Sequence, residues 1–180
     1  PEAWPSDPLM IGRTIEAALE ATALTGDFSQ AQVAIAHPAL RSELVHVTMA
    51  LADEPINVRL HDLERLRTCA LNQALGVDRE ALVVERVGCS GNGFEGVRDP
   101  RGLPATRLRA AFHLVTMPLA VRRVVTQAVE SAGLEVVRLT HTLPALLASL
   151  PDKTLASRRL LLIDAGGLAT DAGLFVDGLW

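Results

Sequence analysis

Apolar residues recur along the chain with two different periods, and these predict its helices and strands. In residues 118–132, valines and alanines fall on one helical face and Gly133 follows directly, so the segment is predicted to be an amphipathic helix that ends at the glycine. In residues 107–115, apolar and polar residues alternate, as in a strand with one buried face. The same patterns predict further helices over residues 11–23, 61–75 and 144–150, and further strands over residues 32–36, 44–49, 81–87, 134–139, 160–164 and 174–176. Helices and strands are interleaved, which indicates the α/β class.

A glycine- and proline-rich stretch, residues 88–102, separates two of the predicted strands. Glycine and proline disfavour regular structure, so a long surface loop is predicted over residues 88–96 and 99–102. Its glycines match the GxGxxG fingerprint of dinucleotide-binding sites. However, Pro100 and Pro104 prevent the helix that must follow such a fingerprint and receive the pyrophosphate. We therefore interpret the stretch as a loop and not as a dinucleotide site.

Composition and charge narrow the classes of partner. The 180 residues are 49% hydrophobic and 21% charged, a balance typical of a globular protein. The formal net charge of −4 provides no basic field for a phosphate backbone, and the 3% of aromatic residues provides no stacking platform, so no nucleic-acid partner is expected. The apolar runs are far shorter than the roughly 20 residues that span a bilayer, so no transmembrane segment is expected.

The cysteines and histidines do not indicate a redox or metal site. Cys69 and Cys89 form no CxxC motif, so we predict two buried thiols in a reducing compartment. The five histidines are widely spaced and lack the close pairing of a metal-binding motif. His113 is predicted to lie on the polar face of the strand at residues 107–115.

The most informative polar residues follow the apolar run at residues 160–163. The run ends at Asp164, then Gly166 and Gly167 form a turn, and Thr170 begins the returning strand. A glycine turn lets backbone N–H groups approach phosphate oxygens, and a carboxylate at the strand end can hold Mg²⁺ through water. An ordinary Gly-Gly hairpin is the alternative.

Taken together, these residues resemble FtsA, an actin-like family of bacterial cell-division proteins. The turn at residues 164–171 is similar to the family's second phosphate loop, usually Asp-Ile-Gly-Gly-Gly-Thr-Thr-Asp. The more specific likeness lies upstream, where four motifs follow the family's order at nearly the same spacing: Glu95-Gly-Val97, Asp99-Pro-Arg-Gly-Leu103, Arg107-Leu108 and Phe112-His-Leu-Val-Thr116. The likeness covers residues 11–180 and is strongest after residue 95.

The resemblance implies a partial actin/Hsp70-like subdomain of the ribonuclease-H type with a small α+β subdomain inserted into it. Residues 1–41 and 137–180 would form part of the first actin-like subdomain, and residues 42–136 would form the insertion. In the family the insertion serves self-assembly and contact with later division proteins. The implied interaction surface consists of Gly91, Gly93, Asp99, Pro100, Arg101 and Gly102.

The resemblance also implies a cofactor, ATP with Mg²⁺, in the full-length protein. It assigns the cofactor contacts to Asp164, Gly166, Gly167 and Thr170, with Asp164 reaching Mg²⁺ through water. Two departures from the family pattern weaken this expectation. Leu168 replaces a glycine, which costs roughly 1 kcal/mol if the position needs a positive φ, and Ala169 replaces a threonine hydroxyl.

The implied function is that of a division scaffold in the cytoplasm, at the inner face of the membrane. Such a subunit polymerises with itself, anchors the FtsZ ring to the membrane and recruits later division proteins. In the family, the first phosphate loop precedes the part matched here, while the adenosine pocket, the FtsZ-tail site and the membrane helix follow residue 180. We predict no catalytic residue and no direct metal ligand in this chain, and at most a weak ATPase in the full-length protein. The alternatives are a PilM-like platform of type IV pilus assembly, a nucleotide-independent interaction module, and a small enzyme that uses the glycine-rich loops.

Overall fold

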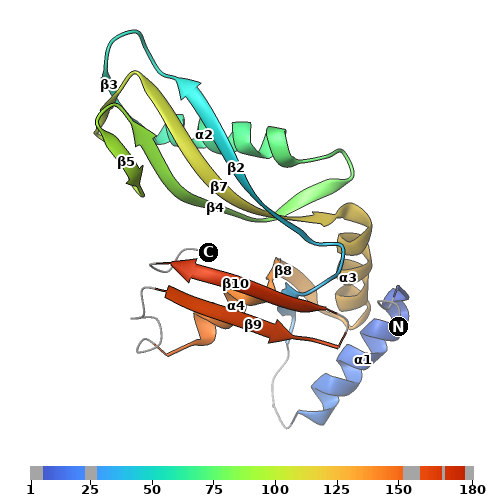
Figure 1. The fold of residues 1–180 in the computed structure, drawn as a ribbon. Helices are drawn as coiled ribbons and strands as arrows, with labels where there is room; N and C mark the ends of the chain where they lie inside the picture. Colours follow the sequence, from blue (N-terminus) through green and yellow to red (C-terminus); the bar gives the residue numbers. More distant parts are fainter. Residues whose placement is uncertain (1–5, 23–27, 152–158, 168, 177–180) are drawn as a thin grey trace.

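Two groups of elements lie one above the other in the structure, which is a computed structural model (Figure 1). It describes residues 6–22, 28–151, 159–167 and 169–176. The upper group is a sheet with a helix packed on one face, and the lower group contains the remaining helices and two smaller strand pairs. The α/β class predicted from the alternating periods is therefore confirmed.

The upper group is a four-stranded antiparallel sheet with the order β2-β7-β4-β5. Its strands are β2 (Arg41–Ala50), β7 (Arg107–Pro118), β4 (Arg79–Gly91) and β5 (Phe94–Val97). Two short strands, β3 (Ile56–Asn57) and β6 (Pro104–Ala105), pair beside it. The edges of the four-stranded sheet are β2 and β5, while β7 lies inside it between β2 and β4.

Helix α2 (Leu60–Ala74) covers one face of this sheet and forms the main core with it. The alternation along β7 places Leu108 and Phe112 on that face, where they are 0% and 2% exposed, and Leu66 of the helix is fully buried against them. At the start of α2, the carboxylate of Asp62 accepts a hydrogen bond from the backbone N–H of Arg59 at 2.9 Å. This bond satisfies one backbone donor at a helix start that lacks a capping hydroxyl.

The lower group is organised around a parallel pair of strands, β1 (Gln30–Ile35) and β8 (Glu135–His141). Helices α1 (Pro8–Ala21) and α3 (Leu119–Ser131) pack closely against each other beside this pair. Gly12 allows the close approach, because a Cβ there would lie 2.0 Å from Ser131 Oγ and 2.9 Å from the carbonyl oxygen of Ala128. A smaller core forms where Ile35, Met117 and Val125 meet.

The remaining elements are α4 (Thr142–Ser149) and a hairpin of β9 (Arg159–Ala165) with β10 (Thr170–Val176). In the described part of the chain this hairpin is a separate two-stranded sheet. Helix α4, which directly follows β8, contacts both strands of the hairpin. Parallel pairing of β1 with β8 thus joins segments from both ends of the chain, while β9 and β10 do not extend that pair. The apolar strand predicted at residues 160–164 is only half buried, since Leu161 and Ile163 are 59% and 61% exposed.

The predicted loop over residues 88–96 is wrong. Strand β4 continues to Gly91 and returns as β5 through a turn in which Gly93 has a φ of 78°. Gly91 does not interrupt the strand. Its lack of a side chain serves packing, because a Cβ there would lie 2.6 Å from the ring of Phe94. The glycines therefore shape a hairpin that the sequence pattern concealed.

Two predictions of burial also need correction. Cys89 is buried as predicted, but Cys69 is exposed on α2. His113 is only 9% exposed, although its position in the alternation of β7 predicts a polar face. The lower group covers this end of the sheet, since β4 contacts β8 and β7 contacts α3, and so buries both faces of β7 near His113.

Candidate functional site

The first candidate site is the turn between β9 and β10, for which the sequence suggests phosphate binding. The turn is closed by a hydrogen bond of 3.0 Å from the N–H of Gly166 to the carbonyl oxygen of Ala169. A Cβ on Gly166 would lie 2.9 Å from that carbonyl oxygen, so glycine is needed there. At Gly167 a Cβ would meet no atom of the described residues within 4 Å, so packing does not require glycine there.

The register of the hairpin divides the predicted contact residues between its two faces. Asp164 lies directly opposite Asp171, and Thr170 lies opposite Ala165. Since neighbouring residues of a strand point to opposite faces, the side chains of Asp164 and Thr170 do not share a face. Sequence analysis thus missed Asp171, which is the residue that accompanies Asp164. Leu168, the departure expected to weaken nucleotide binding, lies outside the described residues.

The two carboxylates of this hairpin are near His141, which ends β8 and precedes α4. The Nδ1 atom of His141 accepts a hydrogen bond of 3.2 Å from the N–H of Leu143, so a neutral ring carries its proton on Nε2. This Nε2 lies 3.8 Å from Asp171 Oδ1. Burial lowers the pKa of His141, while the carboxylates of Asp171 and Asp164 act in the opposite direction.

A second histidine continues this polar cluster into the four-stranded sheet. His113 of β7 forms a hydrogen bond of 2.6 Å through Nε2 with Ser42 Oγ of β2. Burial lowers the pKa of His113, and the charge of a protonated His141 lowers it further. Ser42, His113, His141 and Asp171 thus form a polar junction between the sheet, β8 and the hairpin. A sequence pattern does not reveal this junction because the four residues are far apart along the chain.

The chemistry of the turn fits an oxygen anion with a hydrated cation. The tip is exposed at Gly166 and Gly167, and the Oδ2 atom of Asp171 is buried without a hydrogen-bond partner beside Asp164. Among the described residues, no group of three or more histidine, cysteine, aspartate or glutamate side chains could hold a metal ion. The two carboxylates of the hairpin, Asp164 and Asp171, lie opposite each other on one of its faces.

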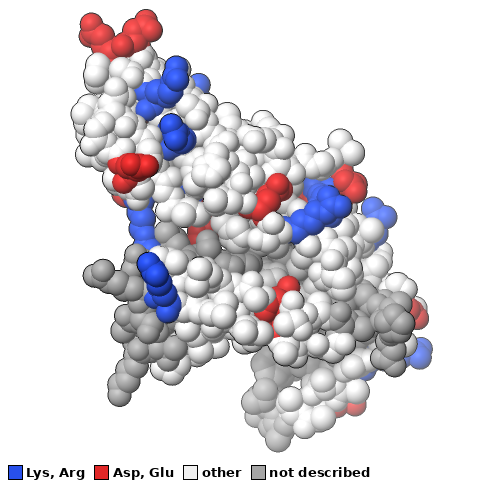
Figure 2. Space-filling model, viewed as in Figure 1, with Lys and Arg blue, Asp and Glu red and all other residues white. Residues whose placement is uncertain are grey.

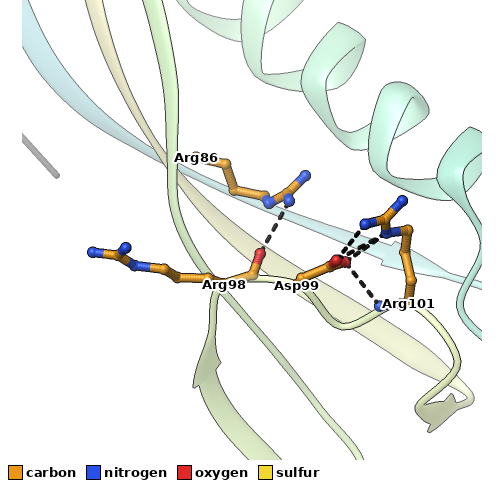
Figure 3. Close-up of polar contacts among 4 residues, drawn as sticks. All are labelled: Arg86, Arg98, Asp99 and Arg101. Carbon is orange, nitrogen blue, oxygen red and sulfur yellow. Dashed lines mark hydrogen bonds and ion pairs between the residues drawn. The ribbon is translucent and has the colours of Figure 1, made fainter. Parts of the chain in front are cut away.

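The second candidate site is the predicted interaction surface on the four-stranded sheet. Asp99 and Arg101 form a forked ion pair there, in which Arg101 Nε lies 2.8 Å and 3.0 Å from the two carboxylate oxygens (Figure 3). Hydrogen bonds from Arg101 lower the pKa of Asp99 to about 2. Next to this pair, Arg86 donates to the carbonyl oxygen of Arg98 at 3.0 Å, which fixes the start of the turn.

The other residues of the predicted surface have mainly structural roles. Pro100 is fully buried, which corrects its assignment to an exposed surface. The N–H of Gly102 donates to the carbonyl oxygen of Val58 at 2.9 Å, and Gly102 adopts a φ of 83°. Together with Gly91 and Gly93 in the β4–β5 hairpin, this glycine shapes the backbone. Only Asp99 and Arg101 present charged side chains to solvent from this set, with exposures of 49% and 57%.

No helix in the described part of the chain has the length and apolar composition needed to cross a membrane.

Comparison with known proteins identifies the upper group. Residues 38–116 match the family model described as the SHS2 domain inserted in FtsA. This range contains strands β2 to β6, helix α2 and nearly all of β7. The resemblance to FtsA predicted from the sequence is thereby confirmed.

Curated relatives extend the likeness beyond this domain. The cell division protein FtsA of Pseudomonas aeruginosa is 30% identical over 146 residues, which are 81% of this chain and 34% of that protein. FtsA of Enterococcus hirae is 28% identical over 64% of this chain and 26% of its own length. FtsA of Enterococcus faecalis is 23% identical over 93% of this chain and 39% of its own length. The chain thus spans about a third of the length of these relatives.

A solved structure has a similar fold. It is described as the PilM-PilN type IV pilus biogenesis complex and aligns with a TM-score of 0.63 over 93% of this chain and 44% of the chain in that structure. The sequence identity is 16%, so this likeness concerns the fold alone.

Proposed function

We propose, from the premise that this chain carries the SHS2 domain of FtsA, that it is part of an actin-like scaffold protein of bacterial cell division. The observation that carries the proposal is the match of residues 38–116 to that domain. The 30% identity to the Pseudomonas aeruginosa protein over 81% of the chain supports it. The whole protein would anchor the FtsZ ring to the inner face of the membrane, polymerise with itself and recruit later division proteins.

The two groups of elements suggest a division of this work. The four-stranded sheet with α2 would be the inserted subdomain, which contacts a neighbouring subunit or a later division protein. Residues 1–41 and 137–180 would contribute to the actin-like part, and the pairing of β1 with β8 supports their association. Helix α3 packs against α1, so residues 119–136 would also belong with the actin-like part, and the insertion would end near the end of β7, earlier than the residue 136 that the resemblance implies.

In the full-length protein, we propose that the β9–β10 turn contacts the phosphates of ATP. Gly166 and Gly167 would let the phosphates approach the backbone, and Thr170 would add a hydroxyl at one side of the turn. Asp164 would hold Mg²⁺ through water, with Asp171 beside it. Any ATPase activity of the full-length protein would be weak.

Capture experiments with the 180-residue chain test the scaffold proposal. The immobilised chain is expected to retain the full-length protein and at least one later division protein from the same cell. It is expected not to retain purified FtsZ on its own, because the resemblance places the FtsZ-tail site after residue 180. Failure to retain any division protein would contradict the proposal.

A pair of matched variants locates the contact on the sheet. Replacement of both Asp99 and Arg101 by alanine removes one charge of each sign from the predicted interaction surface. Replacement of both Arg13 and Glu16 by alanine is the control, because it removes one charge of each sign from exposed positions on α1. Loss of capture in the first variant only would place the partner on the sheet, and equal capture by both would exclude this part of the surface.

Calorimetry tests the proposed cofactor contacts. The chain alone is expected to bind ATP with Mg²⁺ only weakly, because the family's first phosphate loop and adenosine pocket lie outside it. In the full-length protein, Asp164→Asn is expected to weaken Mg²⁺-dependent binding more than Asp99→Asn, which serves as the control. Submicromolar affinity of the 180-residue chain would contradict the idea that it holds only part of the nucleotide cleft.

A PilM-like role in type IV pilus assembly is the second candidate, because the fold aligns with the PilM-PilN complex over 93% of this chain. The same capture experiment distinguishes the two roles. Retention of pilus-assembly proteins and of no division protein would favour the pilus platform.

A further inference from the structure

A polar hollow is lined by residues of β2, β4 and β7 at the end of the four-stranded sheet that is distant from the lower group. In Figure 1 this end of the sheet is at the upper left, and α2 lies on the opposite face. The volume of the hollow is about 390 Å³, and its lining includes Thr48, Ser90, Asn92, Arg107 and Arg109. Figure 2 views the molecule from this side: Lys or Arg atoms appear near its upper end, and Asp or Glu atoms lie above them and to their lower left. The hollow is separate from the β9–β10 turn and from the Asp99–Arg101 pair.

The sheet register places the donors of this hollow side by side. Arg109 of β7 lies opposite Thr48 of β2 on one side and Ser90 of β4 on the other, so these three side chains share one face. Arg107 is two residues away on the same strand and is exposed on the same face. Two guanidinium groups and two hydroxyl groups therefore point to the same region of the surface.

In the hydrogen bonds around the hollow, Asn92 and Ser90 act as acceptors, so their own donor groups are not used in these bonds. The Oδ1 atom of Asn92 accepts bonds from the N–H and the hydroxyl of Thr106, at 2.9 Å and 3.1 Å, so its NH₂ group is the end left for a ligand. Ser90 Oγ accepts a bond of 3.2 Å from the N–H of Gly96 and keeps its own proton to donate. The hollow therefore presents donors where an anion could accept them.

The arginines of the hollow have no acidic partner in the described part of the chain. None of the ion pairs found there involves Arg107 or Arg109, and no carboxylate lines the hollow. Arg101, by contrast, is held by Asp99. Arg107 and Arg109 thus form a local positive patch in a chain with a formal net charge of −4, and an acidic ligand would complement it.

We propose that this hollow binds an extended acidic segment of a partner protein, with carboxylates on alternate residues paired to Arg107 and Arg109. Alternate residues of an extended chain are about 7 Å apart, and the two arginines are themselves alternate residues of β7, so their spacings match. The inference rests on the proposed scaffold function and specifies the chemistry of one partner.

Fluorescence anisotropy of the 180-residue chain with a labelled peptide tests the proposal. The probe is an eight-residue peptide of alternating threonine and aspartate, and its control has asparagine in place of each aspartate. We expect binding of the aspartate peptide that weakens as salt is raised, because exposed charges are screened within about 10 Å at 0.1 M salt. We expect no binding of the asparagine peptide.

Matched double variants separate the hollow from general charge effects. Arg107→Ala with Arg109→Ala is expected to weaken peptide binding roughly tenfold or more. Arg65→Ala with Arg67→Ala removes the same charge from the exposed side of α2 and is expected to leave the affinity within about twofold. Circular dichroism checks that both variants remain folded, which is expected because all four arginines are exposed.

Several results would overturn the proposal. These are equal losses in the two double variants, equal binding of the asparagine peptide, or binding of inorganic phosphate without binding of the aspartate peptide. Absence of peptide binding at millimolar concentration would also reject the acidic ligand. Each of these leaves the scaffold function testable, because capture of division proteins by the chain does not depend on the peptide.

Discussion

The four-stranded sheet and the β9–β10 hairpin both contain strands rich in apolar residues, yet they are buried to very different extents. The sheet and α2 share a continuous core that includes Leu66, Leu108 and Phe112, all at most 2% exposed. The hairpin buries Phe175, while Leu161 and Ile163 on its other face are more than half exposed. One region therefore has a complete core, and the other has apolar side chains on both faces with only one face covered.

The difference indicates which region can fold without further partners. A sheet with one face packed on a helix and one face open to water is normal for antiparallel strands. A strand that is apolar on both faces is typical of a sheet covered on both sides. The hairpin is thus expected to depend on its neighbours for stability, whereas the residues 41–118 that form the sheet and α2, here called the SHS2 unit, are expected to fold cooperatively.

The largest expected effect follows from removal of a core side chain in the SHS2 unit. Phe112→Ala leaves a cavity between the sheet and α2 and should lower the free energy of unfolding by about 3–5 kcal/mol. Leu174→Ala in the hairpin removes a side chain that is 57% exposed, so it should cost less than about 0.5 kcal/mol. Urea denaturation measures both changes. Similar losses in the two variants would mean that the hairpin belongs to the same core.

A second variant affects the lower group through the contact of α1 with α3. Gly12→Ala would gain about 1 kcal/mol from helix propensity alone. The added Cβ meets Ser131 Oγ and the carbonyl oxygen of Ala128, so we expect a net loss of about 1–3 kcal/mol. Addition of Ser131→Ala should recover part of this loss, because it removes the nearest atom and leaves the carbonyl in place.

Thiol labelling shows whether the loss of stability caused by Gly12→Ala is confined to the lower group. Cys89 is 1% exposed in the core of the SHS2 unit, and burial raises the pKa of its thiol, so it should react only when that unit opens. Cys69 is exposed on α2 and should react in the folded protein. If Gly12→Ala speeds labelling of Cys89 as much as Phe112→Ala does, the two regions unfold together and the contrast between them fails.

Local patterns predicted most of the elements because each repeats over many residues. Helices α2 and α3 and strand β7 have strong apolar periods, and the structure confirms each within a few residues. The β4–β5 hairpin was not predictable by the same reasoning. Its glycines disfavour strands on average, and only the ring of Phe94 against Gly91 shows why glycine is suited to this strand.

The candidate site was predictable only where it is continuous in sequence. The turn at residues 164–171 can be found from its glycines and carboxylates, but the face on which each side chain lies depends on the register of the hairpin. The contact of His141 with Asp171 and that of Ser42 with His113 join segments distant in sequence. Neither a period nor a motif encodes such contacts.

The polar junction between the two regions makes a third prediction, for the dependence of stability on pH. Burial lowers the pKa values of His113 and His141 in the folded state. Below the ordinary histidine value of about 6.5, the unfolded state therefore binds more protons, and the free energy of unfolding should fall as the pH decreases. Each histidine contributes a slope of at most about 1.4 kcal/mol per pH unit.

Urea denaturation between pH 7.5 and 5.5 measures this slope. His141→Gln should make the slope shallower by removing one of the two buried histidines, and His46→Gln, at an exposed position, should leave it unchanged. An equally steep slope in the His141 variant would show that His141 does not contribute to the pH dependence of stability in this range.

The smallest expected effect concerns the Asp99–Arg101 pair, which lies in the SHS2 unit but outside its core. Hydrogen bonds from Arg101 lower the pKa of Asp99 to about 2, so its carboxyl carbon should titrate near that pH in an NMR experiment. Arg101→Ala should move the midpoint towards 3.8, and Arg101→Lys should move it less because an ammonium keeps the charge but loses the forked contact. Both side chains are largely in water, so neither variant should change the urea midpoint at pH 7. A large change in that midpoint would mean that the turn holding Asp99 and Arg101 stabilises the core. The difference in stability would then separate the whole SHS2 unit, including this turn, from the hairpin. An unchanged midpoint would show that this exposed pair contributes no measurable stability to the SHS2 unit, as its position outside the core implies.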